Sequence, residues 1–214
     1  MCETSPPRIG RLWLSLGTGL VTAVPVGFFM APVAVLPAFL GLYFFLLFGL
    51  LIGALMYRAA LPAAPVPRRR LYLIGGLTGG VLWTACLAGE YRYLPEGAFN
   101  VVRSNITMVL DPPRREEVRR RVAEHVRDQI NEQYPPGGIV GYARWAIGKG
   151  TLSIPRVIDQ TTLTYRLPGP GWRWPVRVLL SLVLTVGAIL SQFLGLAAPR
   201  PGSDRPAELD HSTA

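Results

Sequence analysis

The first feature of the chain is a long run of apolar residues without charge. No Asp, Glu, Lys or Arg occurs in the 46 residues 12–57, and Arg11 and Arg58 close the run at its two ends. A helix of this length would extend about 69 Å at about 1.5 Å per residue, roughly twice the thickness of the hydrocarbon core of a bilayer. The pattern therefore predicts a hairpin of two transmembrane helices, residues 12–31 and 36–57.

Two prolines mark the turn of this hairpin. Pro32 and Pro37 disfavour continuation of a helix, and each restricts the residue before it. The first segment follows Arg8 and Arg11, as the apolar core of a secretory signal would. Its apolar core is longer than the usual stretch of roughly 7–15 residues, and a second span follows directly. We expect the segment to remain in the protein as a membrane span.

Two further apolar segments, residues 71–89 and 178–198, predict a third and a fourth transmembrane helix. A basic linker rich in proline and arginine, residues 58–70, precedes the third. The N-terminal residues 1–11 and the C-terminal residues 199–214 are expected to be tails, and the second of these to be disordered. Before the fourth segment, indole and guanidinium groups suited to a head-group layer stand at Trp172, Arg173 and Trp174.

Glycines recur at helical spacing inside the second and third segments. Small residues four positions apart let two helix backbones approach closely, and such packing drives helix association in lipid. The pairs predict packing of the spans on one another, with a seam between copies of the chain as the alternative. The residues concerned are Gly49, Gly53, Gly75, Gly76, Gly79 and Gly80.

Residues 90–177, between the third and fourth segments, predict a small basic α+β domain outside the membrane. Alternating apolar and polar positions predict a strand at 99–110, and an apolar side chain at every fourth position predicts a helix at 112–133. A core of this size is marginal alone and is expected to lean on the membrane or on a partner. The other elements predicted are a short helix at 139–147 and a hairpin of strands at 151–156 and 161–167.

The net charge of +9 and the isoelectric point of about 10.2 change the partners to be expected. Such a charge would suggest nucleic acid in a soluble protein, but here the basic residues lie beside spans or on one exposed segment, without a nucleic-acid docking motif. Anionic lipid is therefore the expected partner besides the bilayer itself. Interleaved glutamates also fit a solvated, salt-bridged helix surface. The candidate lipid or protein contacts are Arg114, Arg115, Arg119, Arg120 and Arg121.

The orientation follows from the basic residues near the spans. With four spans both ends of the chain share one side, which carries eight Lys and Arg. The segment 90–177 carries 14, but its 88 residues exceed the roughly 60 within which the positive-inside bias holds. We therefore expect a mainly α, multi-pass protein of the cell membrane, with cytoplasmic termini and residues 90–177 outside the cytoplasm.

No catalytic, cofactor-binding or metal-ligating constellation is visible in the sequence. His125 is the only histidine outside the C-terminal tail, and its sequence neighbours do not complete a catalytic or metal site. Glu90, at the end of the third span, is expected to reach water and to anchor the interface. Cys2 and Cys86 offer neither a disulfide framework nor a paired-cysteine metal site. Phosphate-binding and dinucleotide-binding motifs are lacking as well.

Three function hypotheses remain. The first is a non-catalytic membrane protein whose exposed domain binds a protein partner or an envelope component, in a scaffold or assembly role. The second is an accessory subunit of a channel or transporter, which would require an oligomer or larger partners because four largely apolar helices offer no polar pathway. The third is a lipid-acting enzyme, which would require a histidine and a carboxylate to meet near Glu90.

Overall fold

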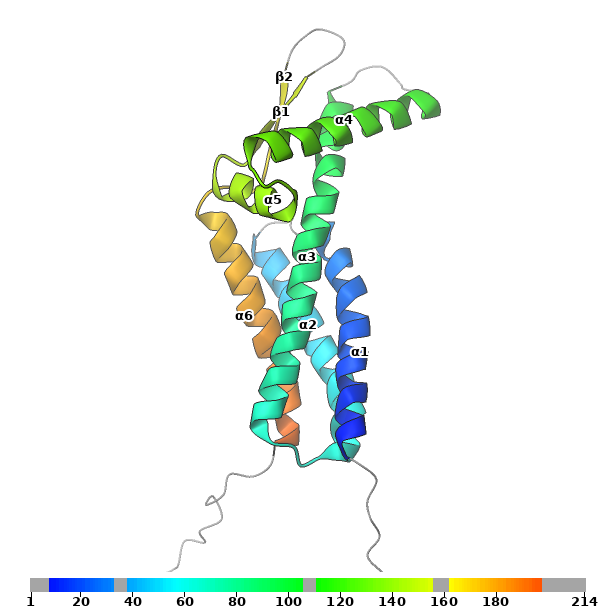
Figure 1. The fold of residues 1–214 in the computed structure, drawn as a ribbon, viewed down its shortest axis with the longest axis vertical. Helices are drawn as coiled ribbons and strands as arrows, with labels where there is room; N and C mark the ends of the chain where they lie inside the picture. Colours follow the sequence, from blue (N-terminus) through cyan, green and yellow to red (C-terminus); the bar gives the residue numbers. More distant parts are fainter. Residues whose placement is uncertain (1–7, 33–37, 106–110, 156–161, 198–214) are drawn as a thin grey trace, which may run out of the picture.

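Four long helices form the body of the protein in its computed structural model, which describes residues 8–32, 38–105, 111–155 and 162–197 (Figure 1). Each of the four is long and apolar enough to cross a membrane. This confirms the predicted fold class, a mainly helical chain with a small α+β region between the third and fourth apolar helices. The four helices are α1 (Arg8–Phe29), α2 (Ala38–Ala60), α3 (Arg68–Ser104) and α6 (Arg173–Phe193).

The four helices pack as a bundle in which α1 contacts α2 and α3, and α6 contacts the same two helices. Helices α1 and α3 run in one direction and α2 and α6 in the other, so α1 begins and α6 ends at the same end of the bundle (Figure 1). At that end, the backbone N–H of Val66 donates to the carbonyl of Leu196 at 2.9 Å. The turn was predicted at 32–37, of which residues 33–37 lie outside the described residues, as does the tail at 199–214.

The outer surface of the bundle is apolar. Between 28% and 39% of the residues in the most apolar stretch of each candidate span are buried inside the protein, so most residues of each stretch keep some exposed surface. Such a surface is unfavourable in water, whereas in a bilayer it contacts lipid tails while the helix satisfies its own backbone hydrogen bonds. The exposed apolar side chains include Trp13, Val21, Phe29, Leu73, Leu179 and Val183.

The chain between α3 and α6 folds at the opposite end of the bundle. Helix α4 (Pro112–Gln133) lies across that end, and α5 (Gly138–Ile147) lies between it and the bundle (Figure 1). Strand β1 (Thr151–Pro155) pairs antiparallel with β2 (Thr162–Arg166). The predicted long helix, short helix and hairpin are therefore confirmed, while the residues 157–160 that join the strands lie outside the described part.

The strand predicted at residues 99–110 is wrong over the part that the structure describes, because α3 continues as a helix to Ser104. The alternation that suggested a strand begins at Val102, two residues before the end of α3. Upstream, the buried side chains recur every three or four residues, which is the repeat of a helix face. Residues 106–110 lie outside the described part. The buried side chains of this region are Leu94, Ala98, Phe99 and Val102.

The α+β region and the bundle share one hydrophobic core. Helix α3 has 37 residues and is about 55 Å long, so nearly half of it extends beyond a hydrocarbon core of about 30 Å. This extension and the first turns of α6 complete the core of a region too small to be stable alone. The core joins Phe99 of α3, Val126 and Ile130 of α4, Trp145 of α5 and Trp174 of α6.

Candidate functional site

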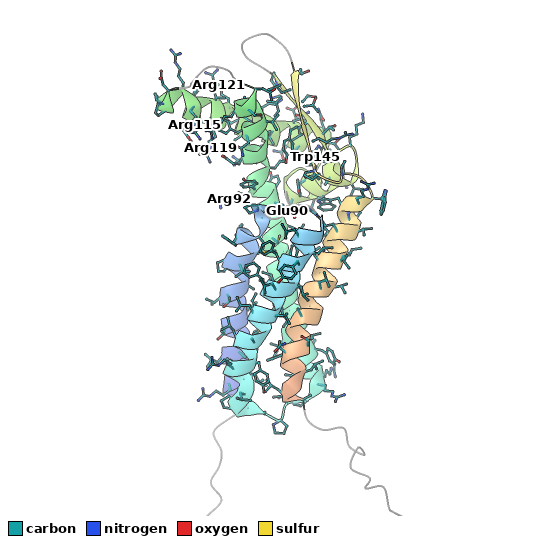
Figure 2. All side chains as sticks on the ribbon, turned by 180° about the vertical axis from the view of Figure 1, so that it is seen from behind. Glu90, Arg92, Arg115, Arg119, Arg121 and Trp145 are labelled. Carbon is teal, nitrogen blue, oxygen red and sulfur yellow. The ribbon has the colours of Figure 1, made fainter. Side chains whose placement is uncertain are left out.

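A buried carboxylate lies where the α+β region meets the bundle (Figure 2). The side chain of Glu90, on α3, is 6% exposed. Nη2 of Arg177, on α6, lies 3.1 Å from both carboxylate oxygens, and the hydroxyl of Tyr142, on α5, donates a hydrogen bond to Oε2 at 3.0 Å. The prediction that Glu90 reaches water is therefore wrong, since side chains of α5 and α6 cover it.

Aromatic rings enclose this ion pair. The ring of Tyr142 lies 5.9 Å from that of Trp174 and 5.7 Å from that of Trp145, between ring centroids. Burial, together with the neighbouring charge of Glu90, raises the pKa of Tyr142, so its hydroxyl stays protonated at neutral pH. The cavity beside these groups holds about 20 Å³, room for one water molecule and not for a substrate. The cluster is suited to joining α3, α5 and α6.

The single histidine of the described residues also has a structural contact. A ring nitrogen of His125 lies 3.0 Å from the carbonyl oxygen of Ser153, which connects α4 to β1. The pairing of a histidine with Glu90 that an enzyme would require is not formed, because the carboxylate is held by Arg177 and Tyr142. Within the described ranges, no three His, Cys, Asp or Glu side chains are grouped to hold a metal ion.

The exposed arginines of α4 are partly paired. Arg120 and Arg121 form ion pairs with Glu117 at 2.8 Å and 2.7 Å, and their hydrogen bonds lower the pKa of that carboxyl. Arg119 reaches back to α3, where Nη2 lies 2.7 Å from Oε2 of Glu96. Three of the five predicted contact arginines thus have a carboxylate partner, as the salt-bridged interpretation of this helix expected.

The beginning of α4 projects away from the rest of the molecule (Figure 1). Arg114 and Arg115 are exposed there and form no ion pair with the described residues. The buried residues of this helix begin only at Val122, near its middle. The first turn of the helix is therefore not covered by the described part of the chain, whereas Val118 packs partly on the core and Arg119 binds Glu96.

A cleft of about 390 Å³ opens between α3, α4 and the end of α1. Figure 2 shows Arg92 and Arg119 on the same side of the molecule, the first on α3 and the second on α4 above it. Arg127 of α4 also lines the cleft, and Phe28 and Ala31 line it from the end of α1. This arrangement places guanidinium groups directly above an apolar helix end.

The six predicted packing glycines divide into two groups. A Cβ atom on Gly53 would stand 3.0 Å from the Cα and carbonyl oxygen of Ile189, so α2 and α6 approach there as closely as glycine allows. At Gly76 and Gly80, in contrast, nothing lies within 4 Å of the position of a Cβ atom. The glycines that face α6 within the chain are Gly49, Gly53, Gly75 and Gly79.

The aromatic and basic residues before α6 also divide. Trp172 is 71% exposed, and the guanidinium of Arg173 lies 6.0 Å from the centroid of its indole ring. Trp174 is only 5% exposed and packs edge-on against Tyr142. Two of the three residues thus remain at the surface, whereas the third belongs to the core.

Sequence reasoning missed the partners of Glu90 and the residues of the cleft. Arg177 and Tyr142 lie 87 and 52 positions from Glu90, and no local spacing connects residues so far apart. Arg92 and Arg127 were missed for the same reason, since they meet only because α4 folds back over α3. The sequence offered one signal for this ion pair, because Glu90 directly follows the third apolar segment and Arg177 directly precedes the fourth.

Comparison with known proteins returns no match, either to a protein-family model, to a curated protein or to a solved structure.

Proposed function

We propose that this protein is a non-catalytic, multi-pass membrane protein in which the α+β region presents the beginning of α4 as a docking surface for another protein. The observation that supports this most is the projecting, charged end of that helix. A helix is normally stabilised by burying one face, yet residues 112–116 are all exposed, and Val118 is the first side chain that packs partly on the core. Such a segment is suited to completing its packing on a partner.

The chemistry of the projecting end favours an acidic partner. Arg114 and Arg115 carry two charges that no carboxylate of the described residues balances. Guanidinium groups bind carboxylates in a bidentate manner and are common at interfaces. A cleft of about 250 Å³ adjoins Arg115, and Pro112 and Phe99 contribute its apolar part beside Arg119, Glu96 and Glu116. An acidic protein surface with an apolar side chain at its centre fits this combination.

The rigid connection of the α+β region to the bundle supports a scaffold or assembly role. Helix α3 passes from the bundle into the region without interruption, and Glu90 on this helix binds Arg177 on α6. The position of α4 relative to the bundle is therefore fixed by packing. We propose cytoplasmic termini and an extracytoplasmic α+β region, on the basis of the positive-inside rule.

A photo-crosslinking experiment in native membranes tests this proposal. A photoreactive residue in place of Glu116, whose side chain is 73% exposed, is expected to form one adduct of defined mass, whereas one in place of Lys149 forms none. The Arg114→Gln/Arg115→Gln variant loses the adduct. The Arg103→Gln/Arg166→Gln variant, with the same change of charge, keeps it. An adduct that survives the first variant, or no adduct at all, would contradict the proposal.

A second candidate function is supported by the open glycines. Gly76 and Gly80 lie one turn apart on α3 and face away from the bundle, where another backbone has room to approach. A homo-oligomer assembled on this face would meet the requirement of an accessory subunit of a channel or transporter. The assembly role is preferred because the described spans carry no charge in their middle that could line a pathway.

A further inference from the structure

We propose that the cleft between α3, α4 and the end of α1 binds a phosphate anion, and that this phosphate is the head group of an anionic phospholipid. The site is distinct from the projecting end of α4 and does not depend on a protein partner. Three arginines and one glutamate line the cleft, which gives it two net positive charges. Its volume of about 390 Å³ lies within the range of small-ligand sites.

The positive charge of the cleft is available to a ligand. Glu96 is already bound by Arg119, whose Nε and Nη2 lie 2.8 Å and 2.7 Å from Oε2. Arg92 and Arg127 are exposed and form no ion pair with the described residues. Glu96 therefore holds Arg119 in place, and the other two guanidinium groups retain their full charge and all their donors.

The floor of the cleft indicates that the phosphate belongs to a lipid. Phe28, Ala31 and Pro32 line the cleft from the last turn of α1 and the residues after it, where the apolar candidate span ends. Phe28 and Val24 are each 42% exposed and Val21 is 76% exposed, so exposed apolar side chains continue along α1 from the cleft. A free phosphate ion would not use this surface, whereas a phospholipid would place its acyl chains along it.

The position of the cleft along the bundle also fits the binding of a lipid head group. A Cβ atom on Gly89 would stand 2.8 Å from the Cβ of Ala31, so α3 and the end of α1 are in close contact at the level of the cleft. In a bilayer this level is the boundary between hydrocarbon and head groups. Arginines at that depth contact phosphates directly, and a guanidinium group donates two parallel hydrogen bonds to one phosphate.

Native mass spectrometry of the full-length protein tests the site. The protein, extracted in mild detergent, is equilibrated with an equimolar mixture of phosphatidylglycerol and phosphatidylcholine. We expect one phosphatidylglycerol to be retained in preference to phosphatidylcholine by about tenfold or more, since hydrogen bonds to charged groups are strong enough for such a ratio. The Arg92→Gln/Arg127→Gln variant loses the preference, and the Arg103→Gln/Arg166→Gln variant keeps it.

Two further measurements separate the alternatives. The Arg92→Lys/Arg127→Lys variant retains the charge without bidentate geometry and is expected to show an intermediate preference, which excludes loss of folding as the cause. Inorganic phosphate in large excess is expected to leave the lipid bound. Displacement of the lipid by phosphate would assign the cleft to a soluble phosphate and overturn the lipid assignment. Equal retention of both lipids by the unmodified protein would overturn the site altogether.

Discussion

Glu90 and Arg177 are 87 positions apart in the sequence, and the buried carboxylate of Glu90 forms an ion pair at 3.1 Å with the partly buried guanidinium of Arg177 where the α+β region meets the bundle. Glu90 lies on the helix by which the chain enters this region, and Arg177 lies on the helix by which it leaves. The pair therefore closes the base of the region and holds the third and fourth apolar helices together at that level.

Removing one member of this pair is expected to cost more than removing both. The Glu90→Leu variant removes the carboxylate that the partly buried guanidinium of Arg177 binds, and breaking a buried pair in this way lowers the free energy of unfolding by up to about 3–5 kcal/mol. The Glu90→Leu/Arg177→Met variant removes both charges and is expected to be more stable than the single variant. Thermal unfolding in detergent, followed by circular dichroism, measures both. A double variant that is less stable than the Glu90→Leu variant would contradict a direct pair.

Replacement of a packed glycine by alanine is expected to lower the unfolding temperature, whereas replacement of an open glycine is not. The Gly53→Ala variant forces a methyl group to 3.0 Å from the backbone of Ile189, so α2 and α6 must separate and the unfolding temperature falls. The Gly80→Ala variant meets nothing within 4 Å and improves helix propensity, so its unfolding temperature stays the same or rises. Similar losses in both variants would be inconsistent with this packing.

The open face of α3 can be tested by its oligomeric state. Isoleucine at both positions, in the Gly76→Ile/Gly80→Ile variant, is expected to leave the fold of one chain intact, because a Cβ atom at either position meets nothing within 4 Å. If this face joins two copies, the bulky side chains keep the backbones apart and the mass in mild detergent falls to that of one chain. An oligomer that keeps its mass in this variant would exclude the face as its seam.

Stability is expected to decline at alkaline pH because of two buried tyrosines. Burial raises the pKa of Tyr142 and of Tyr165, so both keep their protons in the folded protein where the unfolded chain has lost them. Their contribution is complete below the unfolded pKa of about 10 and is lost as the pH rises above it. Denaturant unfolding between pH 8 and about 11 measures the decline.

A matched pair of variants tests whether a buried tyrosine causes this loss of stability at alkaline pH. The Tyr165→Phe variant is expected to flatten the alkaline part of the stability curve, while Tyr72→Phe, at a tyrosine that is 51% exposed, leaves it unchanged. Equal slopes in the two variants would show that the decline has another origin.

The sequence predicted those elements whose pattern is local. The helix Pro112–Gln133 was predicted with its observed ends, because Asp111 and two prolines mark its beginning and an apolar residue at every fourth position marks its buried face. The end of α3 was not predicted, because a change from lipid to protein surroundings leaves the helix intact although the composition changes at Glu90. In a membrane protein, a change from apolar to polar residues thus marks the point at which a helix leaves the lipid, and the helix itself can continue beyond it.

The candidate sites were predicted less well for a physical reason. A residue's charge is visible in the sequence, but its pairing depends on which helices become neighbours. Arg114, Arg115, Arg119, Arg120 and Arg121 were expected to act alike, yet the structure pairs three of them and leaves two exposed without a partner among the described residues.

The central claim, a four-span protein whose α+β region and chain ends lie on opposite sides of the membrane, is tested most directly by thiol labelling. Single cysteines replace Lys149 and Arg68, both exposed, in a Cys2→Ser/Cys86→Ala background. With a membrane-impermeant maleimide, position 149 is expected to react in intact cells and position 68 only after permeabilisation. Reaction of both positions from one side would contradict the four-span arrangement, and reaction of position 68 alone in intact cells would contradict the proposed orientation.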